Sequence, residues 1–420
     1  MRHSLTVTAI MCGLVLPSAA AAQVDSARAA QFFEEAEAVC RADDGALWGV
    51  SLCGPMVFAD ATTGTIATNQ PPPDAPRPRI LGYANAAWRW GDERWSTFVW
   101  AMVPKDPQRR RRMFAHELFH RVQPELELFD PGAPPADHLD TMAGRVWIQL
   151  EWRALAAALR ATGAARARAI ADALAFREAR RAGDSTITAV ERASELNEGL
   201  AQYTGTRLAT ASPAAAIADA IEQLDDVTTQ STFVRTFAYP SGTAYGLLLD
   251  AYAPGWNRRF TKGADLGAAL AAAAHVAPAT DLEAAVARHG GAALRASEAA
   301  RERARLARVD SLTARFVTGP VLVVPRGSGA SFRTDGVTPL PGVGTVVPQY
   351  RVSGPWGSLE AARVLVSGDG ARLTLPGPVR VTGQLLNGPG WTVTLAEGWK
   401  ARPGPREGDL TVVREEGASP

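Results

Sequence analysis

The segment Phe114–His120 constrains this chain more than any other feature. It reads Phe-Ala-His-Glu-Leu-Phe-His, so His116 and His120 lie four residues apart and Glu117 follows the first of them. On a helix, residues four apart project from one face about one turn apart, so both imidazoles can reach one metal ion. Imidazole is a preferred ligand of zinc, and Glu117 is placed to hold a water molecule that the metal polarises. The pattern predicts a helix over 107–123 that carries two metal ligands.

The sequence around this segment is typical of a buried helix. Asp106 and Pro107 form a common helix start, and Pro124 ends the helix. The helix is also rich in apolar side chains, namely Met113, Phe114, Leu118, Phe119 and Val122. These neighbours favour a buried site over the alternative, in which two histidines lie on the surface of an amphipathic helix.

A catalytic zinc site of this kind needs a third protein ligand. The run Leu196–Ala201, Leu-Asn-Glu-Gly-Leu-Ala, resembles the N-E-G-F-A box of gluzincin (clan MA) zinc metallopeptidases, notably the M1-type aminopeptidases. In those enzymes the glutamate of the box is the third zinc ligand, on a helix packed against the HExxH helix. The resemblance implies a zincin-like core in which Glu198 binds the metal. It covers about residues 106–255 and is a match of motifs, because His120 and Glu198 lie 78 residues apart, much farther than in that family.

Other carboxylates compete with Glu198 for the third position. Glu191 and Glu195 lie in the same predicted helix, over 187–210. Glu151 lies within an apolar helix, where an unpaired carboxylate is costly. It is a candidate ligand, a candidate partner of a ligating histidine, or a member of a buried ion pair with an arginine. The sequence leaves these alternatives open.

A second run resembles the same family. Tyr239-Pro-Ser-Gly resembles the Y-x-K-G run of the M1-type enzymes, in which the tyrosine hydroxyl stabilises the oxyanion of the tetrahedral intermediate. The resemblance gives Tyr239 that role, although Ser241 replaces the lysine, and Tyr245 is the alternative donor. The chain has no G-x-M-E-N segment upstream of the metal helix. Specificity for a free amino terminus is therefore not implied.

These residues predict an exported zinc metallopeptidase that acts on a peptide or protein substrate. His116, His120 and Glu198 bind Zn²⁺, and Glu117 is the general base toward a zinc-activated water. Strand 95–103 is a candidate edge that aligns an extended peptide. Two alternatives are a non-catalytic cell-envelope protein with a structural zinc and a zinc hydrolase of non-peptide amides. Glu117 distinguishes the first, because a structural site has no need of it.

Residues 1–22 read as a secretory signal peptide. A positive start at Arg2 precedes the apolar run Leu5–Leu16 and a group of small residues at 18–22. This predicts export to the periplasm or beyond the cell, with no transmembrane segment after residue 22. Two cysteines follow, Cys40 and Cys53, and an oxidising compartment favours a disulfide between them over two buried free thiols.

Charge and local patterns limit the partners and the fold. The chain carries 44 basic and 43 acidic residues, a net charge of +1, which argues against nucleic acid because phosphate binding needs clustered excess cation. The oligomeric state is not predicted. The fold class is α+β: residues 23–105 predict a helix and a mixed β-sheet with strands at 56–59, 80–84 and 95–103. Residues 106–318 are mostly helical, and residues 319–420 predict a small β-sandwich-like or barrel domain.

Overall fold

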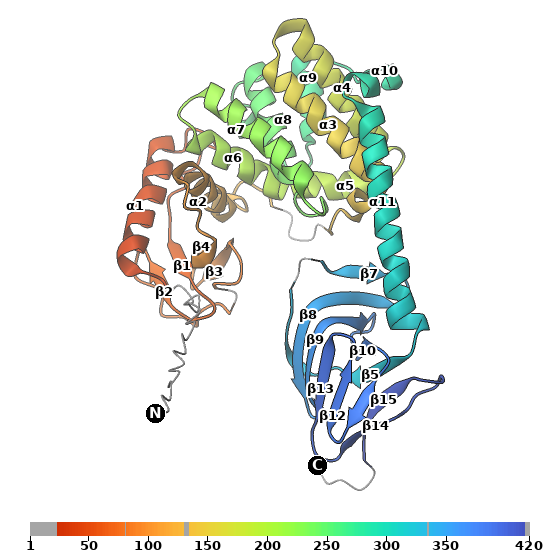
Figure 1. Ribbon diagram of the computed structural model, residues 1–420. Helices are drawn as coiled ribbons and strands as arrows, with labels where there is room; N and C mark the ends of the chain where they lie inside the picture. Colours follow the sequence, from red (N-terminus) through yellow and green to blue (C-terminus); the bar gives the residue numbers. More distant parts are fainter. Residues whose placement is uncertain (1–22, 80, 130–133, 334–335, 416–420) are drawn as a thin grey trace, which may run out of the picture. The chain divides into compact units, whose positions relative to one another are not determined.

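The computed structural model describes residues 23–79, 81–129, 134–333 and 336–415. The predicted signal peptide lies outside these residues. The chain forms two compact units, one that ends at Arg295 and one that begins at Ala296 (Figure 1). Helices and strands both contribute substantially, which confirms a mixed helix-and-strand architecture. No helix in the described part of the chain combines the length and the apolar character needed to cross a bilayer.

The first unit contains a mixed β-sheet with the strand order β2-β1-β4-β3. Its strands are β1 (Met56–Ala59), β2 (Ile66–Thr68), β3 (Ala86–Trp90) and β4 (Glu93–Val99). β1 and β4 run parallel, and the two outer pairs are antiparallel. The mixed sheet was expected, but the strand predicted at 80–84 is wrong over 81–84, the part of it that the structure describes. Gly82 has a φ of +85° in a turn, and the strand begins only at Ala86.

Strand β4 lies inside this sheet and not at its edge. It pairs with β1 on one side and with β3 on the other. The prediction that residues 95–103 offer a free edge to a substrate is therefore wrong. The apolar residues of β4, such as Trp95 and Phe98, indicate that its two faces are covered, and they carry no information about its neighbours in the sheet.

Helices make up the rest of the first unit (Figure 1). They are α1 (Ser26–Asp43), α2 (Pro107–Val122), α3 (Met142–Arg160), α4 (Gly163–Arg181), α5 (Ser185–Ser194), α6 (Leu200–Ala209), α7 (Pro213–Asp226), α8 (Ala238–Tyr252), α9 (Leu266–Ala274), α10 (Leu282–Arg288) and the start of α11 (Gly291–Thr313). A π-helical turn, Glu195–Gly199, joins α5 to α6. Cys40 at the end of α1 and Cys53 before β1 form a disulfide, as predicted.

Helix α2 packs between the sheet and the other helices. The Ser96 hydroxyl of β4 donates a hydrogen bond of 3.1 Å to the carbonyl of Glu117. On the same side, Phe114 contacts Phe98 of β4, with ring centroids 5.2 Å apart. On the opposite side, Gly205 lets α6 approach closely, because a Cβ there would lie 2.6 Å from the Arg112 carbonyl oxygen. The predicted histidine helix is thus held from both sides.

The second unit is built on the end of α11 and an extensive β-sheet. Its strands are β5 (Val321–Pro325), β6 (Ser328–Ser331), β7 (Thr338–Leu340), β8 (Gly344–Gly354), β9 (Gly357–Ser367), β10 (Arg372–Pro376), β11 (Arg380–Thr382), β12 (Leu385–Gly388), β13 (Trp391–Leu395), β14 (Trp399–Pro403) and β15 (Leu410–Arg414). Leu312 at the end of α11 and Phe316 in the π-helical turn that follows it (Ala314–Thr318) pack with Leu340, Val346 and Leu365. The unit therefore begins upstream of residue 319, where the composition changes.

All of these strands belong to one curled sheet, so of the two predicted arrangements the unit is closer to a barrel than to a sandwich of two separate sheets. Strand β9 explains the difference. Along one edge it pairs with β8. Along the other edge it pairs with β13 over Gly357–Ala361 and with β10 around Leu365–Val366. Because a single edge is shared between two strands, the sheet continues around a bend without splitting in two.

Candidate metal centre

Helix α2 presents the two predicted histidines on one face. Its start is fixed by Asp106, whose side chain accepts a hydrogen bond from the Arg109 backbone N–H, and by Pro107 in the first turn. His116 and His120 are then one turn apart, with ring centroids 4.7 Å from each other. Their Nε2 atoms lie 3.0 Å apart. The two nitrogens therefore converge on one point.

Glu198 completes a triad at that point. It belongs to the π-helical turn between α5 and α6, and its Oε2 atom lies 3.3 Å from Nε2 of His116 and 3.5 Å from Nε2 of His120. Helices α3, α4 and α5 occupy the long sequence interval between the two motifs. The structure thus brings together the three residues predicted as ligands. The Glu198 side chain is 33% exposed, so the triad is open to solvent on one side.

Two glycines allow the Glu198 turn to approach helix α8. A Cβ on Gly242 would lie 2.3 Å from Cα of Gly199, a distance that real Cβ atoms essentially never show. A Cβ on Gly199 would in turn lie 3.0 Å from the Ala238 carbonyl oxygen. Close packing of the two backbones places Tyr239, at the start of α8, near Glu198 in the turn.

Two glutamines orient the histidines. Nδ1 of His116 lies 3.0 Å from Oε1 of Gln202, and Nδ1 of His120 lies 2.8 Å from Oε1 of Gln123. An amide oxygen can only accept, so each Nδ1 carries a hydrogen, and in the neutral ring Nε2 keeps the lone pair that binds a metal. The Gln202 amide also donates to Gln223 at 2.7 Å, which fixes which end of Gln202 faces the histidine.

Gln123 also links the two halves of the triad. Its side-chain nitrogen donates hydrogen bonds of 2.7 and 3.0 Å to the carbonyl oxygens of Leu196 and Asn197, in the turn that carries Glu198. Gln123 is fully buried. One side chain therefore sets the ring orientation of His120 and the position of the third ligand. Sequence reasoning missed Gln123 and Gln202. Helical spacing could have indicated both, because Gln123 lies three residues after His120 and Gln202 lies four residues after Glu198.

Glu117 is buried beside the triad, and its Oε2 atom has no hydrogen-bond partner among the described residues. Burial raises the pKa of Glu117 above its ordinary value, the Glu198 charge raises it further, and the two histidines oppose the rise. A buried carboxylate oxygen without a partner is costly unless a ligand or a water molecule satisfies it. This observation fits a residue that works on a molecule bound at the triad.

The triad favours positive charge among its ligand atoms. Burial alone would lower the pKa of His120, but the hydrogen bond with Glu198 and the charges of Glu117 and Glu198 raise it to about 9. For Glu198 both effects have the opposite sign. Burial alone would raise its pKa, but the two histidines hold the pKa below its ordinary value. Two imidazoles and a carboxylate match the donor set of a catalytic zinc site with an open position. No other group of three such ligands is found in the described part of the chain.

Of the two predicted tyrosines, only Tyr239 lies at the triad. Its ring stacks on the His116 imidazole, with centroids 5.5 Å apart and planes within 1° of parallel. Burial and the Glu198 charge raise the pKa of the Tyr239 hydroxyl, so it stays protonated and able to donate. Tyr245 instead donates its hydroxyl to Glu151 at 2.7 Å, inside the helical core. The structure therefore favours Tyr239 over Tyr245 as the hydrogen-bond donor at the triad.

The competing carboxylates lie in a buried ionic cluster. Glu151 is fully buried and forms ion pairs with Arg177, at 3.2 Å, and with Arg180. This matches the ion-pair alternative for that residue. Glu195 pairs with Arg177. Because Glu195 and Glu198 share the π-helical turn, the cluster anchors the turn that carries the third triad residue.

Glu191 and His138 belong to the same buried ionic cluster. Glu191 accepts a hydrogen bond of 2.6 Å from Nε of Arg180. It also lies 2.8 Å from Nε2 of His138, which therefore contacts the cluster and not the triad. With these carboxylates paired to arginines, Glu198 is the carboxylate that faces both histidines.

The chain matches no protein-family model, and comparison with proteins of known function and with solved structures finds no similar protein.

Proposed function

We propose that this chain is an exported zinc-dependent metallopeptidase with a zincin-like, gluzincin-type core. The observation that carries the proposal is the convergence of His116, His120 and Glu198 beside the buried, unpartnered oxygen of Glu117. A mixed sheet packed against the histidine helix, and the π-helical turn between α5 and α6 that supplies the carboxylate, support the core. Export rests on residues 1–22, and the Cys40–Cys53 disulfide supports an oxidising compartment.

Each residue of the site has a role in peptide hydrolysis. Zinc, when bound by the triad, supplies a Lewis acid that polarises a carbonyl and makes water more acidic. Glu117 accepts the proton of the attacking water through its free oxygen and then delivers that proton to the leaving nitrogen. The Tyr239 hydroxyl donates a hydrogen bond to the negative charge that develops on the carbonyl oxygen. Gln123 and Gln202 hold the imidazoles in the required orientation.

One of the two outer strands of the sheet, β3, is suited to hold an extended peptide. β3 pairs with β4 through one edge, and no strand among the described residues pairs with its other edge. Two exposed aromatic side chains, Tyr83 and Trp88, lie just before and within it. Backbone hydrogen bonds to this edge would align a substrate while aromatic rings contact its side chains. We therefore assign to β3 the role that the sequence suggested for 95–103.

The main competing hypothesis is a structural zinc site, and the position of Glu117 argues against it. A structural site is closed by four protein ligands. Here three ligands converge, one side is open to solvent, and a carboxylate oxygen beside them lacks a partner. These features favour catalysis. Substrate profiling with peptides and with other amides distinguishes a peptidase from a hydrolase of non-peptide amides.

Metal analysis tests the proposal directly. Mature protein purified from cells supplied with zinc should contain about one zinc ion per chain, because the described residues form one suitable triad. Elemental analysis of the protein, beside turnover of casein and of a peptide library, measures both halves of the proposal. Chelation should abolish turnover, and added zinc should restore it. Zinc-free protein from such cells would refute the whole proposal.

Replacing Gln123 by Ala should weaken zinc binding by about 10–100-fold, the loss typical of residues that orient a metal ligand. The change frees the His120 ring and also releases the Leu196 and Asn197 carbonyls. Competition with a chelator of known affinity measures the zinc Kd independently of turnover. Gln230→Ala, at an exposed position, is the control. Equal affinity in both variants would show that Gln123 does not position the triad.

A further inference from the structure

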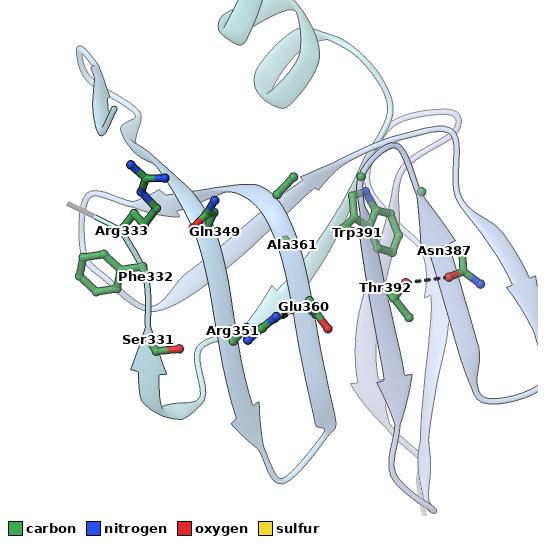
Figure 2. Close-up of a pocket in the computed structure, with 13 residues that line it drawn as sticks. Ser331, Phe332, Arg333, Gln349, Arg351, Glu360, Ala361, Asn387, Trp391 and Thr392 are labelled. Carbon is green, nitrogen blue, oxygen red and sulfur yellow. Dashed lines mark hydrogen bonds and ion pairs between the residues drawn. The ribbon is translucent and has the colours of Figure 1, made fainter. Parts of the chain in front are cut away.

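Two arginines, Arg89 and Arg94, lie directly opposite each other on the hairpin of β3 and β4. Like charges in directly opposite positions repel and destabilise a pair of strands. The second unit shows the favourable arrangement: Arg351 of β8 lies opposite Glu360 of β9, and the two form an ion pair of 2.6 Å, as Figure 2 shows. The arginine pair of the first unit has a second cation where the pair of the second unit has a carboxylate.

Among the described residues, no carboxylate neutralises either guanidinium of the arginine pair. Nη1 of Arg89 donates to the Asp92 carbonyl and Nη1 of Arg94 donates to the Ala87 carbonyl, each at 3.0 Å. Both acceptors are backbone oxygens. Glu93 precedes Arg94 in the strand, so its side chain projects from the other face of the sheet, where it accepts a hydrogen bond of 2.9 Å from a glutamine. The pair therefore keeps its positive charge and most of its N–H donors.

The arginine pair projects from the face of the sheet that helix α2 covers. Side chains alternate between the two faces of a strand, so Arg94 lies on the same face as Ser96, two residues later. The Ser96 hydroxyl donates to the Glu117 carbonyl of α2 at 3.1 Å. Two residues of a strand span about 7 Å. The pair is therefore about 7 Å along the strand from the point where the sheet contacts Glu117.

The guanidinium of Arg94 reaches the outer edge of β3. The Ser96 N–H donates to the Pro55 carbonyl, on the side of β4 that faces away from β3. In an antiparallel pair both backbone groups of a residue point to the same side, so Ser96 exchanges no hydrogen bonds with Ala87, its partner in the register. The Ala87 carbonyl therefore points outward. Because Arg94 donates to this carbonyl, its charge lies at the edge to which we assigned the peptide.

We propose that Arg89 and Arg94 bind a carboxylate of the peptide substrate, so that the site prefers acidic peptides. This inference rests on the proposed function, because it takes β3 as the edge that holds the peptide. A peptide strand beside β3 lies about 4.8 Å from it, within reach of the Arg94 guanidinium at that edge. The remaining N–H groups of the pair suit a carboxylate, which accepts two parallel hydrogen bonds from one guanidinium. The bound anion also removes the repulsion between the two arginines.

Peptide binding to the Glu117→Gln variant tests this proposal, because binding is then measured without cleavage. Three pools of short peptides, randomised over uncharged residues, are compared by fluorescence anisotropy. The first pool carries one Asp and has both ends blocked, the second has a free C-terminus and no Asp, and the third has neither. We expect the first or the second pool to bind about tenfold more tightly than the third, and the difference to shrink at high salt. The tighter of the two identifies the source of the carboxylate.

Variants of the arginine pair, made in the same background, locate the interaction. Arg89→Ala and Arg94→Gln should each raise the Kd of the carboxylate-bearing pool about three- to tenfold and leave the Kd of the third pool unchanged. Arg351→Ala, an exposed strand arginine of the second unit, is the matched control and should bind all three pools as its parent does. Circular dichroism and the melting temperature establish that the variants are folded, which is expected because Arg89 is exposed.

Three results would overturn the inference: no pool binds, all three pools bind equally, or both arginine variants keep the full preference for a carboxylate. Failure of the proposed function has a different signature, namely zinc-free or inactive wild-type protein. Because the binding measurement requires neither zinc nor turnover, a preference for carboxylates that depends on the arginine pair would still be detected in that case.

Discussion

Replacement of Glu117 by Gln should lower kcat/KM for peptide hydrolysis by about 10²–10⁴-fold while the zinc content stays near one ion per chain. Gln keeps the size of the side chain but cannot accept a proton. The Oε2 atom of Glu117 has no partner among the described residues, so the change removes no hydrogen bond from the protein itself. Neutral Gln also avoids the burial of a charge, so we expect no loss of stability.

The measurement combines turnover of the best library peptide with elemental analysis of the same preparation. Glu125→Gln is the matched control, because Glu125 is exposed and lies just beyond the same helix. The activity of this variant should equal that of the wild-type chain. Loss of zinc in the Glu117 variant would point to a structural role in the site. Retained zinc with undiminished turnover would show that another group takes the proton.

The part of the site that lies within one helix was predictable. The positions of His116, Glu117 and His120 follow from helical geometry alone, and the cap at Asp106 fixes where that helix begins. Glu198 was identified as a ligand only through a motif, because no local rule links it to His120, 78 positions away. The structure supplies the physical link: Gln123 binds the turn that carries Glu198, and Gly242 allows α8 to approach it.

Features that depend on strand neighbours were not predictable. Alternation and apolar content indicate that a strand is covered, and so β4 was recognised as a strand, but its apolar residues fit the interior and the edge of a sheet equally and the choice of an edge that aligns substrate was wrong. The same limit applies to the second unit, where turn spacing suggested a sandwich or a barrel and did not decide between them. Only the pairing of β9 with both β10 and β13 shows that one sheet curls instead. Which arginine neutralises Glu151 was equally beyond sequence reasoning, since the chain is rich in arginine.

Glu198 and Glu151, two of the carboxylates considered for the third ligand position, should behave differently on mutation. Glu198→Gln should weaken zinc binding by more than about 100-fold, beyond the loss expected for a residue that only orients a ligand. Its zinc-free form should melt within a few degrees of the wild-type protein, because the side chain is partly exposed. Chelator competition and thermal unfolding of the zinc-free proteins provide the two measurements.

Glu151→Gln should show the opposite pattern. It leaves Arg177 and Arg180 buried with too little compensating charge, so the free energy of unfolding should fall by about 3 kcal/mol or more. Below its lowered melting temperature the variant should bind zinc with nearly wild-type affinity, because Glu195 still pairs with Arg177 and anchors the turn that carries Glu198. If Glu151→Gln instead lost zinc while Glu198→Gln kept it, the assignment of the third ligand would be wrong and the ionic cluster would have to be reconsidered as the metal site.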